Sequence, residues 1–228
     1  MRDVLPREPW HELGDDLKWM GAVLGRLRDL DVMEELFDAH LAPGSTLREE
    51  VTSSLRQRRA SCRDDVDELL ESARYGKLVK RLKRLSRHPV MGDVGDVAAA
   101  EVFMPSLWAA VGTYFAAIGD PLDHRNDESL HLVRIASKKC RYNFEVAALY
   151  AGDEARVVAE SLEAIQTILG EVHDRSVAVA FLDSLSLAPE ADLEVRRAFR
   201  AEIAELRPQW IPHFRDVQRD VVAVFAGD

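Results

Sequence analysis

Side chains that could hold phosphate gather on one predicted helix of this chain. The segment SLHLVRIASKKCRYNFEV covers residues 129–146, and its apolar positions recur at helical spacing. The opposite side carries His131, Arg134, Lys138, Arg141 and Tyr142, with Lys139 at its edge. No acid occurs from Ser129 to Phe144, so we expect no i,i+4 ion pair to relieve the repulsion along this stripe. A bound anion would relieve it. The alternative is an ordinary outer face, paired with acids from neighbouring helices.

Two further predicted helices carry cations without intervening acids on one side. In RYGKLVKRLKRL, the shared face holds Lys77, Lys80, Arg81, Arg84 and Arg87. A third helix contributes Arg56, Arg59 and Arg63. The whole chain has 40 acids against 30 Lys and Arg and a net charge of −10, which argues against general nucleic-acid affinity. A polyanion site must therefore be local, and several charge-assisted hydrogen bonds of about 1.5–3 kcal/mol each would suffice for binding without a catalytic group.

The elements that must position these side chains are helices throughout. Apolar residues recur at three and four spacing, and Gly and Pro cluster in a few short breaks, which predicts an all-α protein. The expected helices cover residues 10–40, 46–73, 75–87, 98–118, 128–150, 155–183, 190–206 and 209–225. The most apolar stretch, residues 97–119, contains Glu101 and Pro105 and favours a buried helix over a membrane span. The charged, proline-containing start predicts no signal peptide, and two unrelated cysteines predict neither a disulfide nor a zinc site, so we expect a cytoplasmic protein.

An internal repeat divides the chain. Residues 17–32 align with residues 162–177 at an offset of 145. Identical pairs are Leu17/Leu162, Leu24/Leu169, Gly25/Gly170, Asp29/Asp174 and Val32/Val177, and Arg28 aligns with His173. The repeat predicts two related helical halves, about residues 1–96 and 97–228. The counterpart of His131 would fall before residue 1, so the first half is expected to lack its basic helix. The apolar surface left uncovered would favour self-association.

These motifs resemble the CHAD domain family, named for conserved histidines in an α-helical domain. The resemblance rests on His131-x-x-Arg134-Ile135-x-x-Lys138-Lys139-x-Arg141-Tyr142-x-x-Glu145 and on the repeated Leu-Gly-x-x-(Arg/His)-Asp-x-x-Val segments. It implies two pseudo-symmetric helical bundles that form one domain around a basic central cavity. It also implies binding of inorganic polyphosphate, without enzymatic activity or a cofactor, and a location that includes polyphosphate granules. Some family members are fused to a triphosphate-cleaving domain. The family's first basic helix is expected to be missing here, either through truncation of the sequence or because this member has a reduced site, and its loss would bear on affinity more than on ligand class.

The predicted phosphate contacts combine the stripes, apart from Arg87, with this resemblance. Arg28 and His173, at equivalent places in the repeat, complete the set. Arginine offers planar bidentate contacts and lysine a mobile point charge. His131 is either a structural hydrogen-bonding group or a contact whose protonated form strengthens binding as pH falls. Asp29 and Asp31 lie on different faces of a helix, so Asp29 is expected to orient an arginine and no metal site is predicted.

Two other functions remain open. A phosphoanhydride hydrolase or histidine phosphotransfer module would act through His131, although no glycine-rich phosphate loop or acidic metal cluster accompanies it. A helical scaffold would present its basic faces to an acidic protein partner. Neither a specific nucleic acid nor a membrane is an expected partner.

Overall fold

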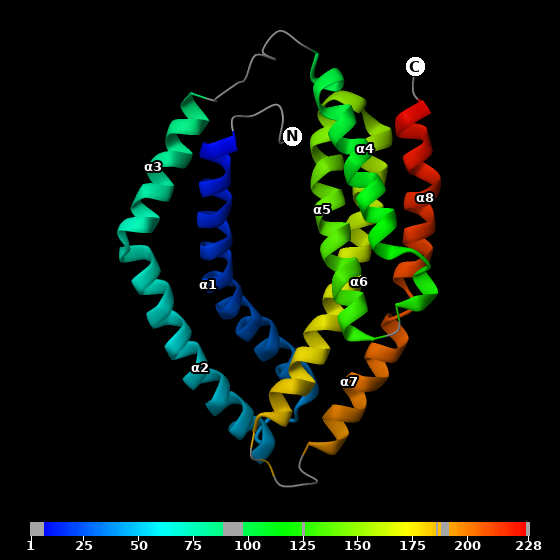
Figure 1. The fold of residues 1–228 in the computed structure, drawn as a ribbon. Coiled ribbons are helices and arrows are strands. Elements are labelled where there is room, and N and C mark those ends of the chain that lie inside the picture. Colours follow the sequence, from blue (N-terminus) through cyan, green and yellow to red (C-terminus); the bar gives the residue numbers. More distant parts are fainter. Residues whose placement is uncertain (1–6, 89–97, 125, 186, 188–191, 227–228) are drawn as a thin grey trace. The chain divides into compact units, whose positions relative to one another are not determined.

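Every regular element in the part of the chain described by the computed structural model is a helix. That part comprises residues 7–88, 98–124, 126–185, 187 and 192–226. The all-α prediction is confirmed (Figure 1). In chain order the elements are α1 (Arg7–His40), α2 (Thr46–Glu71), α3 (Ala73–Arg87), α4 (Ala99–Ile118), the 3-10 helix η1 (Pro121–Asp123), α5 (Asp127–Ala151), α6 (Asp153–Asp183), α7 (Leu193–Leu206) and α8 (Trp210–Ala226).

Local capping residues explain where the cation-bearing helices begin. Ser45 accepts a hydrogen bond from the Arg48 backbone N–H at the start of α2. Ser72 accepts one from the Tyr75 N–H and so separates α2 from α3 within a single residue. Asn126 accepts from the Ser129 N–H and fixes the first turn of α5. These polar caps set the helical register, and the register determines which face each cation occupies.

The described helices belong to two compact units. Unit 1 comprises residues 1–96 and 181–195, and unit 2 comprises residues 97–180 and 196–228. The helices α6 and α7 each contribute residues to both units. The pseudo-symmetric arrangement of two helical bundles around a central basic cavity stays a prediction.

Unit 2 has the larger apolar core. Its centre includes Phe144 of α5, Leu162 of α6 and Phe214 of α8, each with at most 1% of its surface exposed. The buried stripe of α5 consists of Leu130, Val133, Ser137, Cys140, Phe144 and Ala147. Burial raises the pKa of the Cys140 thiol to about 12, since the thiolate would lose its hydration. This stripe holds one side of α5 against the core, so the cationic side must face outward.

In unit 1, a small apolar cluster lies where α1 meets α3. Its buried residues are Leu13, Leu78 and Leu85, with Trp10 and Met20 packed against them. Further buried apolar residues of this unit, such as Phe37 and Val51, lie along α1 and α2. The repeat positions show the difference between the units. Leu17 and Leu24 are 38% and 41% exposed, whereas their counterparts Leu162 and Leu169 are 0% and 2% exposed. Unit 1 thus leaves apolar side chains of α1 in contact with solvent, and self-association through them stays a prediction.

The apolar helix α4 is buried along one side only. Leu107, Val111, Tyr114 and Ile118 face the core, while Trp108 is 57% exposed. Among the described residues, Glu101–Ile118 is the segment whose length and hydropathy would allow it to cross a membrane, and 22% of that segment is buried. The prediction of a buried helix is therefore correct for one face and wrong for the other.

Candidate anion-binding surfaces

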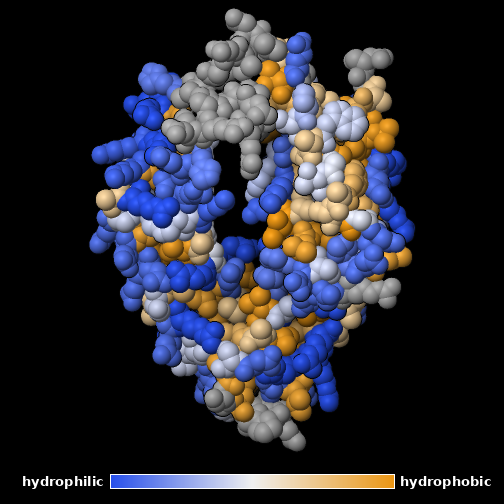
Figure 2. Space-filling model, in the orientation of Figure 1, coloured by the Kyte–Doolittle hydropathy of each residue, from blue (hydrophilic) through white to orange (hydrophobic). Residues whose placement is uncertain are grey.

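The clearest unpaired cationic surface lies on α3 in unit 1. Leu78 and Leu85 are buried, 1% and 8% exposed, and they hold the apolar side of α3 against the unit. The exposed cations of α3 without an ion pair among the described residues are Lys77, Lys80, Lys83, Arg84 and Arg87. We call these five residues the α3 surface. Figure 2 shows hydrophilic surface over the region that α2 and α3 occupy in Figure 1. Three of the five belong to the predicted contact set.

Lys83 and Arg87 were the members of the α3 surface left out of the predicted contacts. Both lie in the same acid-free run as the others, so the signal was present in the sequence. Lys83 lies at the edge of the cationic face of α3, so its angular position excludes it from a narrow stripe. Its long, flexible side chain can nevertheless reach the surface that the other cations form.

Arg81 differs from its neighbours because carboxylates of α1 hold its guanidinium. Its Nη2 donates to Glu12 Oε2 at 2.6 Å, and its Nη1 donates to Asp16 Oδ2 at 3.3 Å. Asp16 also accepts from Arg74 Nε at 2.8 Å, and the Arg74 guanidinium lies 4.4 Å from the centre of the Trp19 ring. Arg81 therefore joins α3 to α1, and its charge is already balanced.

The cations of α2 divide in the same way. Arg59 pairs with Asp31 and, at 2.6 Å from Nη1, with Glu34 Oε2. The hydrogen bond to Asp31 raises the pKa of Arg59 above its ordinary value, with Glu34 adding to the effect. Arg56 and Arg63 are exposed and have no ion pair among the residues described. Of the three arginines predicted on α2, Arg56 and Arg63 are therefore available to a ligand, whereas Arg59 is held by its ion pairs with α1.

In unit 2, α5 and α6 bring the two predicted histidines together. The ring centroids of His131 and His173 are 5.6 Å apart, with 37° between the ring planes. One turn along α5, Arg134 extends over α6, since a Cβ built on Gly170 would meet Arg134 Nε at 3.9 Å. That distance is an ordinary contact, and α6 continues through Gly170 as α1 does through Gly25, so neither glycine breaks its helix.

Arg141, at the far end of the α5 stripe, is already bound by acids. Its Nη1 lies 3.3 Å from Glu145 Oε1 and 3.0 Å from Glu163 Oε1. The expectation that the stripe has no i,i+4 ion pair was wrong, because Glu145 lies one residue beyond the segment free of acids. Tyr142 is 47% exposed, and its ring centre lies 5.3 Å from the Arg141 guanidinium carbon and 6.0 Å from Lys138 Nζ.

The cations of α5 that have no ion pair in the described ranges are Arg134, Lys138 and Lys139. Together with the neighbouring imidazole of His131 they form the α5 surface. Both the α3 and α5 surfaces are built from side chains whose helices are anchored by apolar residues on the opposite side. Each offers charge that no carboxylate of the described chain neutralises.

The carboxylates of the Arg28-Asp29-x-Asp31 segment bind arginines. Asp29 Oδ1 lies 3.6 Å from Arg28 Nη1, and Asp31 pairs with Arg59 of α2. Asp29 therefore lies beside an arginine, and its orienting role stays a prediction. The described residues contain no group of three or more His, Cys, Asp or Glu side chains placed to hold a metal ion.

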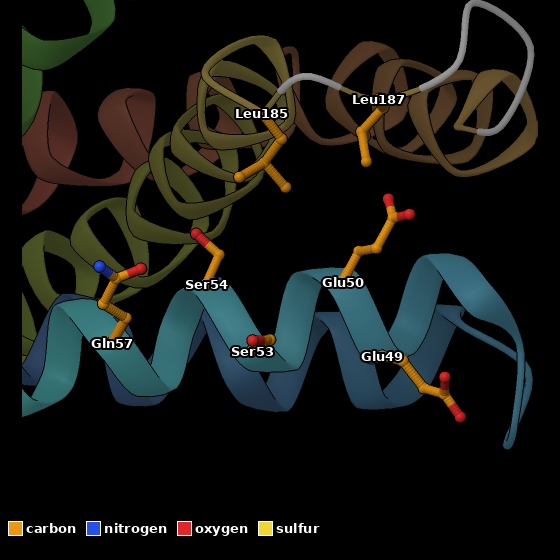
Figure 3. A pocket seen from close by; sticks show the side chains of 7 residues that line it. All are labelled: Glu49, Glu50, Ser53, Ser54, Gln57, Leu185 and Leu187. Atoms are coloured by element: carbon orange, nitrogen blue, oxygen red, sulfur yellow. The ribbon is translucent and has the colours of Figure 1, made fainter.

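A pocket of unit 1 has the wrong charge for a phosphate. It encloses about 510 Å³ between α2 and the segment after α6. Figure 3 shows Glu50 and Ser54 pointing from α2 toward Leu187 and Leu185. Glu49 also lines it, and no cation does. An anion would be repelled there, so the candidate surfaces of unit 1 are the exposed cations and not this pocket.

His124, which sequence reasoning left without a role, is structural. Its Nε2 lies 2.6 Å from the Ile118 carbonyl oxygen, and its ring meets the Trp210 ring edge-on at a centroid distance of 6.1 Å. These contacts tie the turn after α4 to the start of α8. No phosphate contact is expected of it.

Comparisons with known proteins agree with these motifs. A family model described as CHAD domain matches residues 1–183. Two uncharacterized proteins of Mycobacterium tuberculosis, MT2285 of strain CDC 1551 / Oshkosh and Rv2226 of strain H37Rv, are each 27% identical over 183 residues. The matched region is 76% of this chain and 34% of each of those proteins, so the chain corresponds to about a third of their length. No solved structure matches the chain.

Proposed function

Because the chain belongs to the CHAD domain family, we propose that it is a non-enzymatic binding protein for inorganic polyphosphate or a similar phosphate-rich linear anion. The observation that carries the proposal is the α3 surface, whose five cations have no ion pair among the described residues of this acidic chain. Arg81, on the same helix, has two carboxylate partners. Ion pairing was therefore available locally, and the remaining α3 cations lie where the described acids do not reach them.

The shape of the α3 surface suits a linear ligand. Residues 77–87 rise by about 15 Å along the helix axis, at about 1.5 Å per residue. Five positive side chains over that distance form a row, not a compact cluster. A polymer of phosphates laid along α3 would meet several of them in succession, with lysines adjusting to its position and arginines donating paired hydrogen bonds.

The α5 surface supports the same ligand class from unit 2. There Arg134, Lys138 and Lys139 have no ion pair among the described residues, and the imidazole of His131 is their neighbour on the same helix. We also propose a cytoplasmic location that includes polyphosphate granules, because the proposed ligand is the main component of such granules.

Calorimetric titration with long-chain polyphosphate tests the proposal. At low salt we expect measurable binding, and the affinity should fall as salt rises because bound cations release the counterions of the polymer. Phosphate release should be followed in the same samples with and without Mg²⁺. Absence of binding by the folded chain at low salt overturns the proposal. Phosphate release abolished by His131→Ala would replace it with the hydrolase alternative.

A further inference from the structure

A separate pocket in unit 2 has the composition of a site for a small phosphate. It encloses about 330 Å³ and is lined by Asp127 of α5, Ser176 of α6, Arg200 of α7 and Arg207 in the turn after α7, together with small and apolar side chains. That volume is at the lower end of the range for small-molecule sites. None of these four polar residues belongs to the predicted contact set, and all four lie outside the acid-free stripes.

The two arginines of this pocket differ in how they are held. Arg200 is exposed and has no ion pair among the described residues. Arg207 is 36% exposed in its side chain, its Nη2 donates to Asp127 Oδ1, and its Nε is buried without a hydrogen-bond partner. One cation is therefore available, and the second is held in place by a carboxylate that is itself half exposed.

The polar groups next to the pocket also favour an anion. The Ser176 hydroxyl oxygen is buried without a hydrogen-bond partner, which is unfavourable unless a ligand or water binds it. A smaller recess of about 10 Å³ is lined by His131, His173, Asp127 and Ser176, so the latter two residues connect it to the pocket. The recess itself is too small for a ligand, but it places two imidazole rings next to the pocket.

We propose that this pocket binds a compact phosphate anion of the size of orthophosphate or pyrophosphate. Arg200 and Arg207 would each donate paired hydrogen bonds to phosphate oxygens, since the guanidinium fork matches that geometry. Asp127 would compete with the ligand for Arg207 and so limit the affinity. The anion is either free pyrophosphate or the terminal phosphates of a longer chain. The pocket does not depend on the α3 surface or on polyphosphate binding there.

Pyrophosphate titration of three variants tests this site. Arg200→Ala should reduce pyrophosphate affinity about tenfold, as expected for the loss of one charge-assisted contact. Asp127→Asn should increase it several-fold, because Arg207 is released and a negative charge is removed. Arg215→Ala, which removes an exposed arginine of α8 outside the pocket, should leave it unchanged. A merely structural role of Asp127 would give no gain in affinity.

The source of the anion follows from competition. Short and long polyphosphate, at equal total phosphate, should displace pyrophosphate unequally if the pocket holds chain ends, since the short sample has more of them. Equal displacement identifies free pyrophosphate as the ligand. The proposal is overturned if pyrophosphate does not bind at low salt, or if Arg200→Ala and Asp127→Asn both leave its affinity at the wild-type value. Neither result would bear on long-chain binding at α3.

Discussion

Replacing Arg84 by alanine should weaken polyphosphate binding, whereas the same replacement at Arg81 should leave it nearly unchanged. The two arginines lie three residues apart on α3, and each substitution changes the net charge by one. Arg84 is exposed and has no acid partner among the described residues. Arg81 Nη2 lies 2.6 Å from Glu12 Oε2, and its Nη1 lies 3.3 Å from Asp16 Oδ2. A difference between the variants therefore reports a local contact and not the overall charge.

The size of the effect follows from the exposure of Arg84. A hydrogen bond to a charged group contributes about 1.5–3 kcal/mol, and the lower end applies to a solvent-exposed side chain. Arg84→Ala should thus lower the affinity roughly tenfold. One fewer phosphate contact should also make the logarithmic dependence of affinity on salt less steep by about 0.7, the value for a single-stranded polyanion.

The Arg81→Ala variant should instead lose stability. Its ion pairs join α3 to α1 at a partly exposed position, so the expected cost is about 1 kcal/mol in the free energy of unfolding. The assay is calorimetry at two salt concentrations, with urea unfolding of both variants as the control. If Arg81→Ala reduces affinity as much as Arg84→Ala and flattens the salt dependence equally, the distinction between paired and unpaired cations is refuted.

Three further outcomes are expected. Glu163→Gln removes one of the two carboxylates at Arg141 and should strengthen polyphosphate binding a few-fold; an unchanged salt dependence would speak against a contact by Arg141. Leu162→Ala should cost about 2–5 kcal/mol in the free energy of unfolding and Leu17→Ala under about 1 kcal/mol, since these repeat positions are 0% and 38% exposed, and equal urea midpoints would contradict that difference. Cys140 is buried, with its pKa raised to about 12, and should not react with a thiol reagent at about pH 8 until the protein unfolds, whereas the half-buried Cys62 should react first. The rates at which the two cysteines of the native protein are labelled test this, and labelling of Cys140 as fast as Cys62 would contradict it.

Helical structure and the orientation of each stripe could be predicted from the sequence. Both depend on short-range spacing, because apolar residues three and four apart must share one side of a helix. The predicted apolar side of the 128–150 helix is the side that α5 buries, with Phe144 fully inside, so its cations lie on the outside. The Ser and Asn caps at which these helices begin also act within a few residues.

The pairing of individual cations could not be predicted, because it depends on residues distant in the sequence. Arg81 and Arg84 are indistinguishable members of one stripe until α1 places Glu12 and Asp16 beside the first of them. The pocket in unit 2 likewise requires Asp127 to meet Arg207, 80 residues further along the chain. Periodicity fixes the side of a helix on which a charge lies. Only the packing of one helix against another determines whether that charge is already neutralised, since Coulombic attraction is strong only over a few ångströms.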